Sequence, residues 1–246
     1  MSKEVHIVVE SHKITCDTVY APEYDGKSSL PYLLPMYNQC VYYDQYRLEE
    51  IIKDGQSVVV DVGASVGLTT MFAARLGAAK IFSFEPNPID RLALEFVARD
   101  NPSVVTAISA AVSDTNGSMM LCISPSLGGS EMVPLENDDR TPLHEEILLA
   151  EDAIEISTTT LDSFFEDEGV EVDILKIDAE GCEKRVLAGA EGLLNRWRPT
   201  IVMASYHRPE DRDELPEVVR QICPAYDVEE HFLEEGLEPM IRMRAR

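Results

Sequence analysis

Alternating apolar and polar stretches predict that most of this chain is built from strands and helices in turn. The clearest example starts at Val58–Val60, a short β-branched run that is typical of a buried strand. Apolar residues at helical spacing follow from Leu68 to Leu76, and a second strand is predicted at Ile81–Phe84. The alternation continues to about residue 222, which predicts an α/β fold with a mainly parallel sheet and helices on both faces.

The same patterns place the other elements and divide the chain. Residues 1–20 predict a small hairpin outside the main sheet, and the proline-containing residues 21–40 predict an ordered loop or cap. We therefore expect an N-terminal hairpin and cap segment at 1–42 and one main domain at 43–246. Further strands are predicted at 104–108, 118–123, 154–158 (an edge strand), 172–177, 200–204, 226–232 and 237–243, and further helices at 42–53, 89–99, 160–168, 183–194 and 209–220.

The loop-like residues 124–153 contain several prolines, glycines and acids. A stretch of this length inside a compact domain is usually functional, which predicts a lid or substrate loop. A disordered acidic insertion is the alternative. The aromatic residues of 42–53 have two interpretations as well: they form a wall of a substrate pocket, or they pack the N-terminal segment onto the core.

Composition excludes several classes of protein. The formal net charge of −24 over 246 residues argues against a nucleic-acid partner and against anionic membrane surfaces. The sequence contains neither a long apolar span nor a signal peptide, so we expect a cytoplasmic protein. The five cysteines form no CxxC and the five histidines form no HxH or HExxH, so we expect neither a disulfide framework nor a metal site.

The segment from Asp61 to Glu85 has the pattern of half a nucleotide-binding crevice: strand, glycine turn, helix, strand and acid. Glu85 lies eighteen residues after Gly67, close to the spacing of a carboxylate that accepts hydrogen bonds from ribose hydroxyls. Gly63 and Gly67 form GxxxG and not the dinucleotide pattern GxGxxG. A carboxylate at Asp61 would repel a pyrophosphate but suits an amino group and a sulfonium, which points to S-adenosylmethionine. The alternative is an ordinary strand-turn-helix with a surface Glu.

Polar residues follow four of the predicted strands: Asp61, Glu85, Asp178 and His207. The carboxyl ends of parallel strands meet at one rim of the sheet, where ligands bind in open α/β folds. Four strand ends that carry chemically useful groups at one rim predict an active site there.

Several blocks, in this order, resemble the FkbM family of S-adenosylmethionine-dependent methyltransferases. The resemblance covers roughly residues 43–210, and its most specific part is the block from Lys176 to Glu183. It implies a class I methyltransferase Rossmann-like fold with a seven-stranded sheet, a small N-terminal cap, and methyl transfer to a hydroxyl on a small molecule such as a sugar, lipid or polyketide. The blocks are Asp61–Gly67, Phe84–Pro88, Ala111–Asp114 with Gly117, Lys176–Glu183 and Tyr206–Asp211.

The resemblance also implies roles for individual residues. The implied cofactor-binding residues are Asp61, Gly63, Ala64, Ser65, Gly67, Glu85, Pro86, Asn87, Ala111 and Asp178. A hydroxyl acceptor needs a general base, for which Asp178 is the first candidate and His207 the second, since its ordinary pKa suits base chemistry near neutrality. Glu180 orients the substrate or caps the following helix.

Two other functions fit the same fold. One is an NAD-dependent oxidoreductase, which the missing third glycine and Asp61 disfavour. The other is a module that binds S-adenosylmethionine without turnover. The acceptor and the oligomeric state are not predicted by the sequence.

Overall fold

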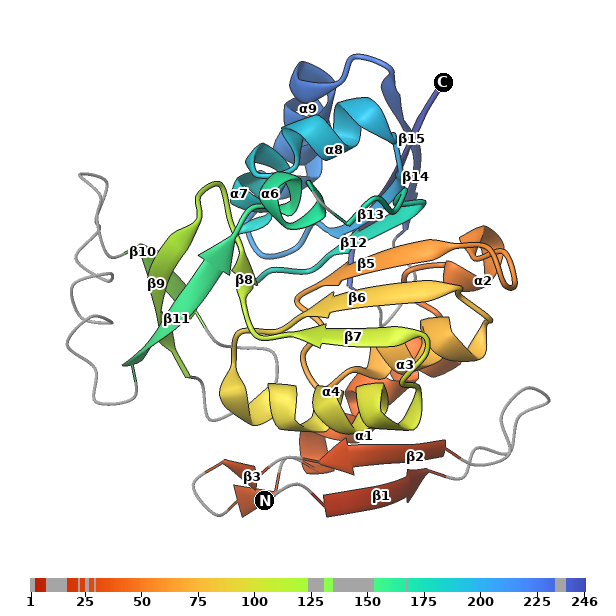
Figure 1. Ribbon diagram of the computed structural model, residues 1–246, viewed down its shortest axis with the longest axis vertical. Coiled ribbons are helices and arrows are strands. Elements are labelled where there is room, and N and C mark those ends of the chain that lie inside the picture. The colour runs from red at the N-terminus through yellow and green to blue at the C-terminus, as the bar shows by residue number, and fades with distance from the viewer. Residues whose placement is uncertain are drawn as a thin grey trace.

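The computed structural model describes residues 3–7, 17–21, 23–24, 27–28, 30–123, 131–134, 153–166, 168–232 and 238–246. Its main sheet has seven strands (Figure 1), in the spatial order β7 (Val105–Ile108), β6 (Lys80–Phe84), β5 (Val58–Val62), β12 (Ile174–Ile177), β13 (Thr200–Ala204), β15 (Met240–Ala245) and β14 (Tyr226–Phe232). β15 runs antiparallel to β13 and β14, and the other neighbouring pairs are parallel. The prediction of a mainly parallel seven-stranded sheet is confirmed.

Helices cover both faces of this sheet, as the sequence predicted (Figure 1). Strand residues alternate between two apolar clusters: Val59 packs in one, and Val60 and Val62 pack in the other. The cluster around Val59 includes residues of α1 (Leu30–Tyr37), α3 (Leu68–Arg75) and α4 (Pro88–Asp100). The opposite cluster includes residues of α6 (Leu161–Phe165), α7 (Glu183–Ala188), α8 (Glu191–Arg196) and α9 (Asp211–Ile222). None of the helices in these described stretches is long and apolar enough to cross a bilayer.

The N-terminal region departs from the prediction after its first hairpin. β1 (Lys3–Ile7) and β2 (Asp17–Ala21) pair antiparallel in a separate sheet, which confirms the hairpin. β3 (Glu23–Tyr24) and β4 (Lys27–Ser28) form a second short pair. The chain then enters α1 and the π-helix η1 (Asn38–Tyr42), where the sequence predicted a loop or cap without naming a helix. Pro31 stands in the first turn of α1, where its missing N–H is tolerated.

The helix predicted over 42–53 is wrong for most of its length, because after the end of η1 at Tyr42 only α2 (Leu48–Ile51) is helical there. Asp44 and Arg47 have left-handed backbone angles, φ 47° and 53°, which interrupt any continuous helix. The Asp44 carboxylate accepts hydrogen bonds from the N–H groups of Leu48 and Glu49, so it starts α2 after the turn.

A second sheet lies beside the carboxyl ends of β5, β6 and β12 (Figure 1). Its strands are β10 (Glu131–Pro134), β9 (Gly117–Cys122), β11 (Ala153–Thr159) and β8 (Ala111–Val112), in that spatial order. The strand predicted at 154–158 is confirmed as β11, but its predicted position at an edge is wrong, because β11 pairs with β9 on one side and β8 on the other. Of the predicted lid at 124–153 the structure describes β10 and the first residue of β11; the remainder lies outside the described residues.

The helix predicted over 183–194 is two helices, α7 and α8. A Cβ at Gly189, between them, would lie 2.0 Å from the carbonyl oxygen of Ser113, so the backbone of the β8 segment presses against this junction. Thr160, by contrast, caps α6 as predicted: its Oγ1 accepts a hydrogen bond from the Ser163 N–H.

The order of the main sheet reverses between β5 and β12, which are neighbours although more than a hundred residues separate them along the chain. The chain moves outward from β5 to β7 on one side, and from β12 to β13 on the other. Ligand crevices in open α/β sheets lie at the carboxyl ends of the strands at such a reversal. Gly63 and Asp178 immediately follow these two strands.

Candidate functional site

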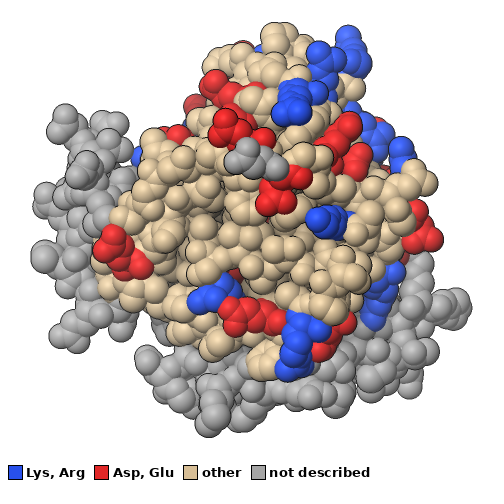
Figure 2. Space-filling model, viewed as in Figure 1, with Lys and Arg blue, Asp and Glu red and all other residues tan. Residues whose placement is uncertain are grey.

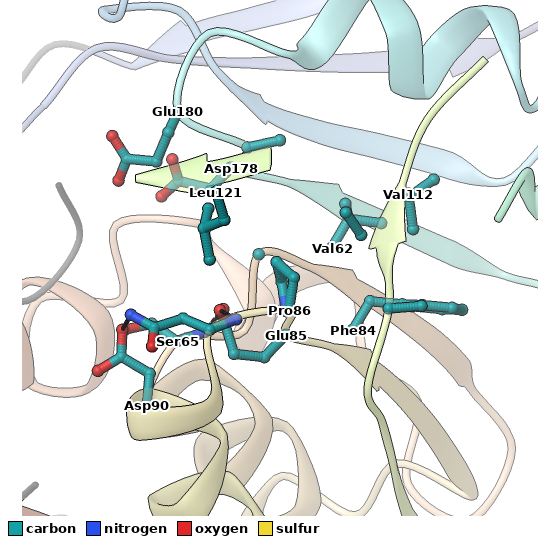
Figure 3. Close-up of a pocket in the computed structure, with 15 residues that line it drawn as sticks. Val62, Ser65, Phe84, Glu85, Pro86, Asp90, Val112, Leu121, Asp178 and Glu180 are labelled. Atoms are coloured by element: carbon teal, nitrogen blue, oxygen red, sulfur yellow. Dashed lines mark hydrogen bonds between the residues drawn. The ribbon is translucent and has the colours of Figure 1, made fainter. Parts of the chain in front are cut away.

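Two adjoining hollows lie at the carboxyl ends of β5, β6 and β12, and we name each after one residue. The Glu85 cavity encloses about 570 Å³, including the part open to solvent. Asp178 and Glu180 stand on one side of it, and Ser65, Glu85 and Asp90 on the other (Figure 3). Its lining residues are Val62, Gly63, Ser65, Phe84, Glu85, Pro86, Asn87, Asp90, Ala110, Ala111, Val112, Leu121, Asp178, Ala179 and Glu180.

The second hollow, the Tyr46 cavity, encloses about 650 Å³ by the same measure and shares Gly63, Ser65, Asp178 and Glu180 with the first. One wall of this cavity comes from the N-terminal segment, which contributes Met36, Gln39, Cys40, Gln45 and Tyr46. The other lining residues are Ala64, Val66, Leu68, Thr69, Lys176, Tyr206 and Glu238. Tyr46 is also fully buried in the core, whereas Tyr42 and Tyr43 are exposed. Both interpretations of these aromatic residues therefore hold for Tyr46.

Glu85 faces the first cavity from the end of β6 and also ties two turns together. Its carboxylate accepts hydrogen bonds of 2.8 Å from the N–H of Ser65 and from the N–H of Asn87. Burial, with the nearby charge of Asp90, raises the pKa of Glu85 to about 8. Asn87 and Ala111 line the same cavity, and their contact with a cofactor stays a prediction; the Asn87 side chain also caps α4 by accepting from the Ile89 N–H.

The two glycines of the glycine turn, Gly63 and Gly67, are required for different contacts. Gly63 has φ +72°, and a Cβ there would lie 1.8 Å from the carbonyl oxygen of Asp178, so glycine lets β5 and β12 end side by side. The N–H groups of Gly63 and Ala64 both donate to the carbonyl of Phe84. Gly67 lines neither cavity as described: with φ +85° it precedes α3, and a Cβ there would press on Leu94 and Val97 of α4.

Asp61 is not among the lining residues of either described cavity. Its carboxylate lies 2.9 Å from Lys176 Nζ and accepts a 2.7 Å hydrogen bond from the Thr70 hydroxyl, and both charged side chains are about 1–2% exposed. Lys176 Nζ also donates to the carbonyl of Gly63 at 2.7 Å. Through this hydrogen bond the Asp61–Lys176 pair stabilises the backbone of the glycine turn. Direct contact of Asp61 with a ligand stays a prediction.

Asp178 borders both cavities, where two tyrosines from distant parts of the chain donate to it. The Tyr46 hydroxyl lies 2.6 Å from Asp178 Oδ2, and the Tyr206 hydroxyl lies 3.2 Å from Oδ1. The carboxylate is thus held in one orientation between the two hollows. This position suits a group that acts on a molecule in one cavity while facing a molecule in the other.

His207 lies next to Asp178 and contacts three carboxylates. Nδ1 lies 2.9 Å from Glu183 Oε1, and Nε2 lies 3.4 Å from Asp178 Oδ1 and 3.5 Å from Glu180 Oε2. Burial opposes the charged imidazolium, but Glu183, Asp178 and Glu180 outweigh it and raise the pKa of His207 to about 9. His207 is therefore protonated at neutral pH, which disfavours it as a general base.

Glu180 does not cap the helix that follows it, so that alternative is wrong. In the described chain the N-cap residue of α7 is Cys182, without a side-chain cap, and the nearby N–H groups of Ala179 and Gly181 donate to Glu183. Glu180 has φ 50° and turns its carboxylate toward the cavities and His207. Burial, together with the charge of Asp178, raises its pKa to about 7.

We expect Glu180→Gln to stabilise the protein at pH 8 but not at pH 4.5. The folded-state pKa lies above the ordinary 4.5, so ionising Glu180 opposes folding; the penalty is absent below pH 4.5 and complete above 7. Since the side chain is 34% exposed, solvent screening limits the gain to about 1 kcal/mol. Urea unfolding of both proteins at the two pH values measures it. An equal difference at both values, or the same pattern for the exposed control Glu217→Gln, would contradict this account.

Sequence reasoning missed three residues of this region, Lys176, Glu183 and Glu238, and it named Tyr46 only as one of the aromatic residues of 42–53. Tyr46 lies in a stretch that was predicted to be a helix, and Glu238 lies before a strand and not after one. Lys176 and Glu183 belong to the block that carried the resemblance, but nothing in their spacing indicates which partners they meet. Lys176 inside the apolar strand β12 was the one available signal, since a buried lysine requires a partner.

Residues 61–231 match the family described as Methyltransferase FkbM domain. Methyltransferase sdnD of Sordaria araneosa is 30% identical over 158 residues, which cover 54% of this chain and 60% of that protein. The crystal structure of Methyltransferase FkbM from Methylobacillus flagellatus KT superposes with a TM-score of 0.58 at 18% identity, over 84% of this chain and 47% of that chain.

The chain thus spans about half to three fifths of the length of these two proteins. The structural likeness, at this low identity, concerns the fold alone. Together with the order of the main sheet it confirms the predicted Rossmann-like architecture.

Proposed function

The chain belongs to the FkbM methyltransferase family, and from this premise we propose that it transfers a methyl group from S-adenosylmethionine to a hydroxyl group of a small molecule. The observation that carries the proposal is the Asp178 carboxylate, which borders both cavities and is held by two tyrosine hydroxyls. Cofactor and acceptor would then occupy neighbouring hollows with one carboxylate between them.

The Glu85 cavity fits the cofactor by its charge. Four of its lining residues are carboxylic acids, Glu85, Asp90, Asp178 and Glu180, and its described lining contains no lysine or arginine. Such a lining disfavours the pyrophosphate of NAD and favours a cation without phosphate. Ser65 Oγ, also in the lining, is buried without a described hydrogen-bond partner, so it is free to bind a polar ligand group.

The residues that would hold the cofactor come from three strand ends. Glu85 would accept hydrogen bonds from the ribose hydroxyls, and Asn87 and Ala111 would border the adenosine. Gly63 and Ser65 line both cavities and would border the amino-acid end of the cofactor. When bound, S-adenosylmethionine supplies an electrophilic methyl group whose leaving group is a neutral sulfide.

Asp178 is the general base in this proposal. It must take the proton of the acceptor hydroxyl, and a carboxylate aligned by Tyr46 and Tyr206 can do this without reorienting. His207, protonated at neutral pH, would stabilise the negative charge of Asp178 and Glu180. The enzyme otherwise needs only to align donor and acceptor and to exclude water.

A nucleic-acid acceptor is disfavoured by electrostatics. The net charge is −24, and on the face shown in Figure 2 the basic side chains are scattered among acidic and neutral ones without forming a continuous stripe. Binding of phosphate backbones requires such clusters of lysine and arginine. A small hydroxylated acceptor in the Tyr46 cavity is therefore the preferred substrate class.

The proposal is tested by calorimetry with S-adenosylhomocysteine. We expect the native protein to bind it and Glu85→Gln to bind it about 1–3 kcal/mol more weakly, the scale of leaving a buried hydrogen-bonding group without its partner. The N–H groups of Ser65 and Asn87 donate to different oxygens of Glu85, and Gln keeps one acceptor oxygen, so one of these two backbone hydrogen bonds should persist. Glu95→Gln, on the exposed face of α4, is the matched control.

Two outcomes would count against the proposal. The first is a folded native protein that releases no heat with S-adenosylhomocysteine but binds NADH. The second is Glu85→Gln binding as tightly as the control. Methyl transfer itself is then measured with labelled S-adenosylmethionine and a panel of hydroxylated small molecules.

A further inference from the structure

Gln45 lines the Tyr46 cavity and carries an oxygen atom that has no partner in the described chain. The residue is 4% exposed, and its Oε1 is buried without a hydrogen bond to any described residue. A buried acceptor without a partner lowers stability, and most such groups in folded proteins are paired. The unpaired oxygen is explained if it pairs with a molecule that enters the cavity.

The other polar atoms of Gln45 hold its amide group in place. Nε2 donates to the sulfur of Cys40 at 3.8 Å, and the backbone N–H donates to the carbonyl of Gln39 at 3.0 Å. Burial raises the pKa of the Cys40 thiol to about 12, so the sulfur is uncharged at neutral pH. Because the nitrogen and the oxygen of an amide point apart, the contact of Nε2 with Cys40 leaves Oε1 available on the other side.

Gln45 and the proposed general base border the same hollow. The residue after Gln45, Tyr46, donates from its hydroxyl to Asp178 Oδ2 at 2.6 Å. The left-handed backbone angles at Asp44 and Arg47 place Gln45 and Tyr46 together in one turn. A molecule in the Tyr46 cavity can therefore contact Asp178 with one group and Gln45 with another.

The charges in the lining of the Tyr46 cavity limit what that molecule can carry. Three carboxylic acids line the cavity: Asp178, Glu180 and Glu238. Lys176 is the one basic residue of its described lining, and its Nζ already pairs with Asp61 at 2.9 Å and donates to two backbone carbonyls. The lining therefore offers no spare cation to a carboxylate or phosphate group, which the three acids would repel.

We propose that Gln45 is a specificity-determining residue whose Oε1 accepts a hydrogen bond from the methyl acceptor. The acceptor is then a molecule without anionic groups that carries a second hydroxyl or an amine, besides the hydroxyl that Asp178 deprotonates. A site built to hydrogen-bond such a group rejects the analogue that lacks it, because the buried oxygen then stays unpaired. Gln45 lies ahead of residues 61–231, so membership of the family does not specify it. The inference rests on the proposed function for the reaction, but the site is measured by binding alone.

The test is binding of matched probes to the full-length chain, with and without S-adenosylhomocysteine, followed by saturation-transfer NMR. Catechol, phenol and salicylate form one series, and the vicinal cyclohexane diol, cyclohexanol and the corresponding hydroxy carboxylate form the other. We expect each diol to bind roughly 10-fold more tightly than the mono-alcohol of the same ring, the scale of one hydrogen bond, and the carboxylates to bind most weakly. Gln45→Met keeps the length of the side chain without the oxygen, so it should lose the preference for the diols.

A melting curve measures the unpaired oxygen without any ligand. Gln45→Met removes a buried acceptor that the described chain leaves without a partner, so the melting temperature should rise by about 2–4 °C. Gln221→Met, at an exposed position of α9, is the matched control. It should change neither the melting temperature nor the binding of the probes, since methionine and glutamine have similar helix propensities.

The proposal is overturned if neither diol binds, if a carboxylate binds as tightly as its diol, or if Gln45→Met keeps the native preference for diols. A lower melting temperature of Gln45→Met would overturn it too, because the oxygen would then be paired in the free protein. The comparison of probes on the native chain does not depend on how the variant folds. Diol binding that depends on Gln45, in a chain that does not bind S-adenosylhomocysteine, would instead reject the proposed methyl transfer alone.

Discussion

Replacing Lys176 by methionine is expected to lower the free energy of unfolding by about 3–5 kcal/mol, the cost of leaving one buried charge without its partner. Asp61, 1% exposed, would lose the ammonium group that lies 2.9 Å from it. The carbonyl of Gly63 would lose a 2.7 Å hydrogen bond at the same time. Urea unfolding followed by circular dichroism measures the difference.

Two further variants test the explanation. Asp61→Asn combined with Lys176→Met removes both charges, so most of the lost stability should return, because neutral replacements of buried pairs are often tolerated. Lys184→Met breaks an exposed pair with Glu214 and should change stability by less than about 1 kcal/mol. If Lys176→Met matched Lys184→Met, the buried pair would not be what holds the glycine turn.

Asp178→Asn is expected to lower turnover by about 10²–10⁴-fold, the usual contribution of a general base. An amide cannot accept the proton of a hydroxyl acceptor, but it keeps the size of the side chain and one oxygen for Tyr46. Binding of S-adenosylhomocysteine should be nearly unchanged, because Glu85, Asn87 and Ala111 remain in place. Single-turnover rates and calorimetry on the same preparation separate the two effects.

The matched control is Asp114→Asn, which changes an aspartate outside both cavities that pairs with Arg185. It should turn over like the native enzyme. If Asp178→Asn instead abolished cofactor binding, Asp178 would belong to the donor side alone and the base would have to be sought elsewhere in the Tyr46 cavity.

The rim of the sheet could be predicted because strand ends are visible in a sequence. Gly63, Glu85 and Asp178 each follow an apolar run, and parallel strands bring such ends together whatever the details of packing. The register between strands is not visible in the same way. Asp61 was expected to face a ligand, whereas β5 and β12 pair so that Asp61 lies directly beside Lys176.

Contacts between segments that are distant along the chain could not be predicted from the sequence either. Tyr46 donates to a carboxylate 132 residues later, and its segment was expected to be a continuous helix. The left-handed angles at Asp44 and Arg47 break that helix and form the turn that contains Tyr46. Propensity favours a helix there; the turn forms because Tyr46 and Leu48 are buried in the tertiary core, which local patterns do not specify.

The segment from α1 to Tyr46 lies outside the stretch that defines the family, residues 61–231, yet it forms one wall of the Tyr46 cavity. Under the proposed function, residues ahead of the matched stretch would therefore take part in recognising the acceptor, whereas the residues proposed to bind the methyl donor lie within it. A relative with the same strands but different residues before β5 would be expected to keep methyl transfer and to accept different substrates. Grafting foreign residues ahead of β5 is thus a route to new acceptors that leaves Glu85 and its surroundings untouched.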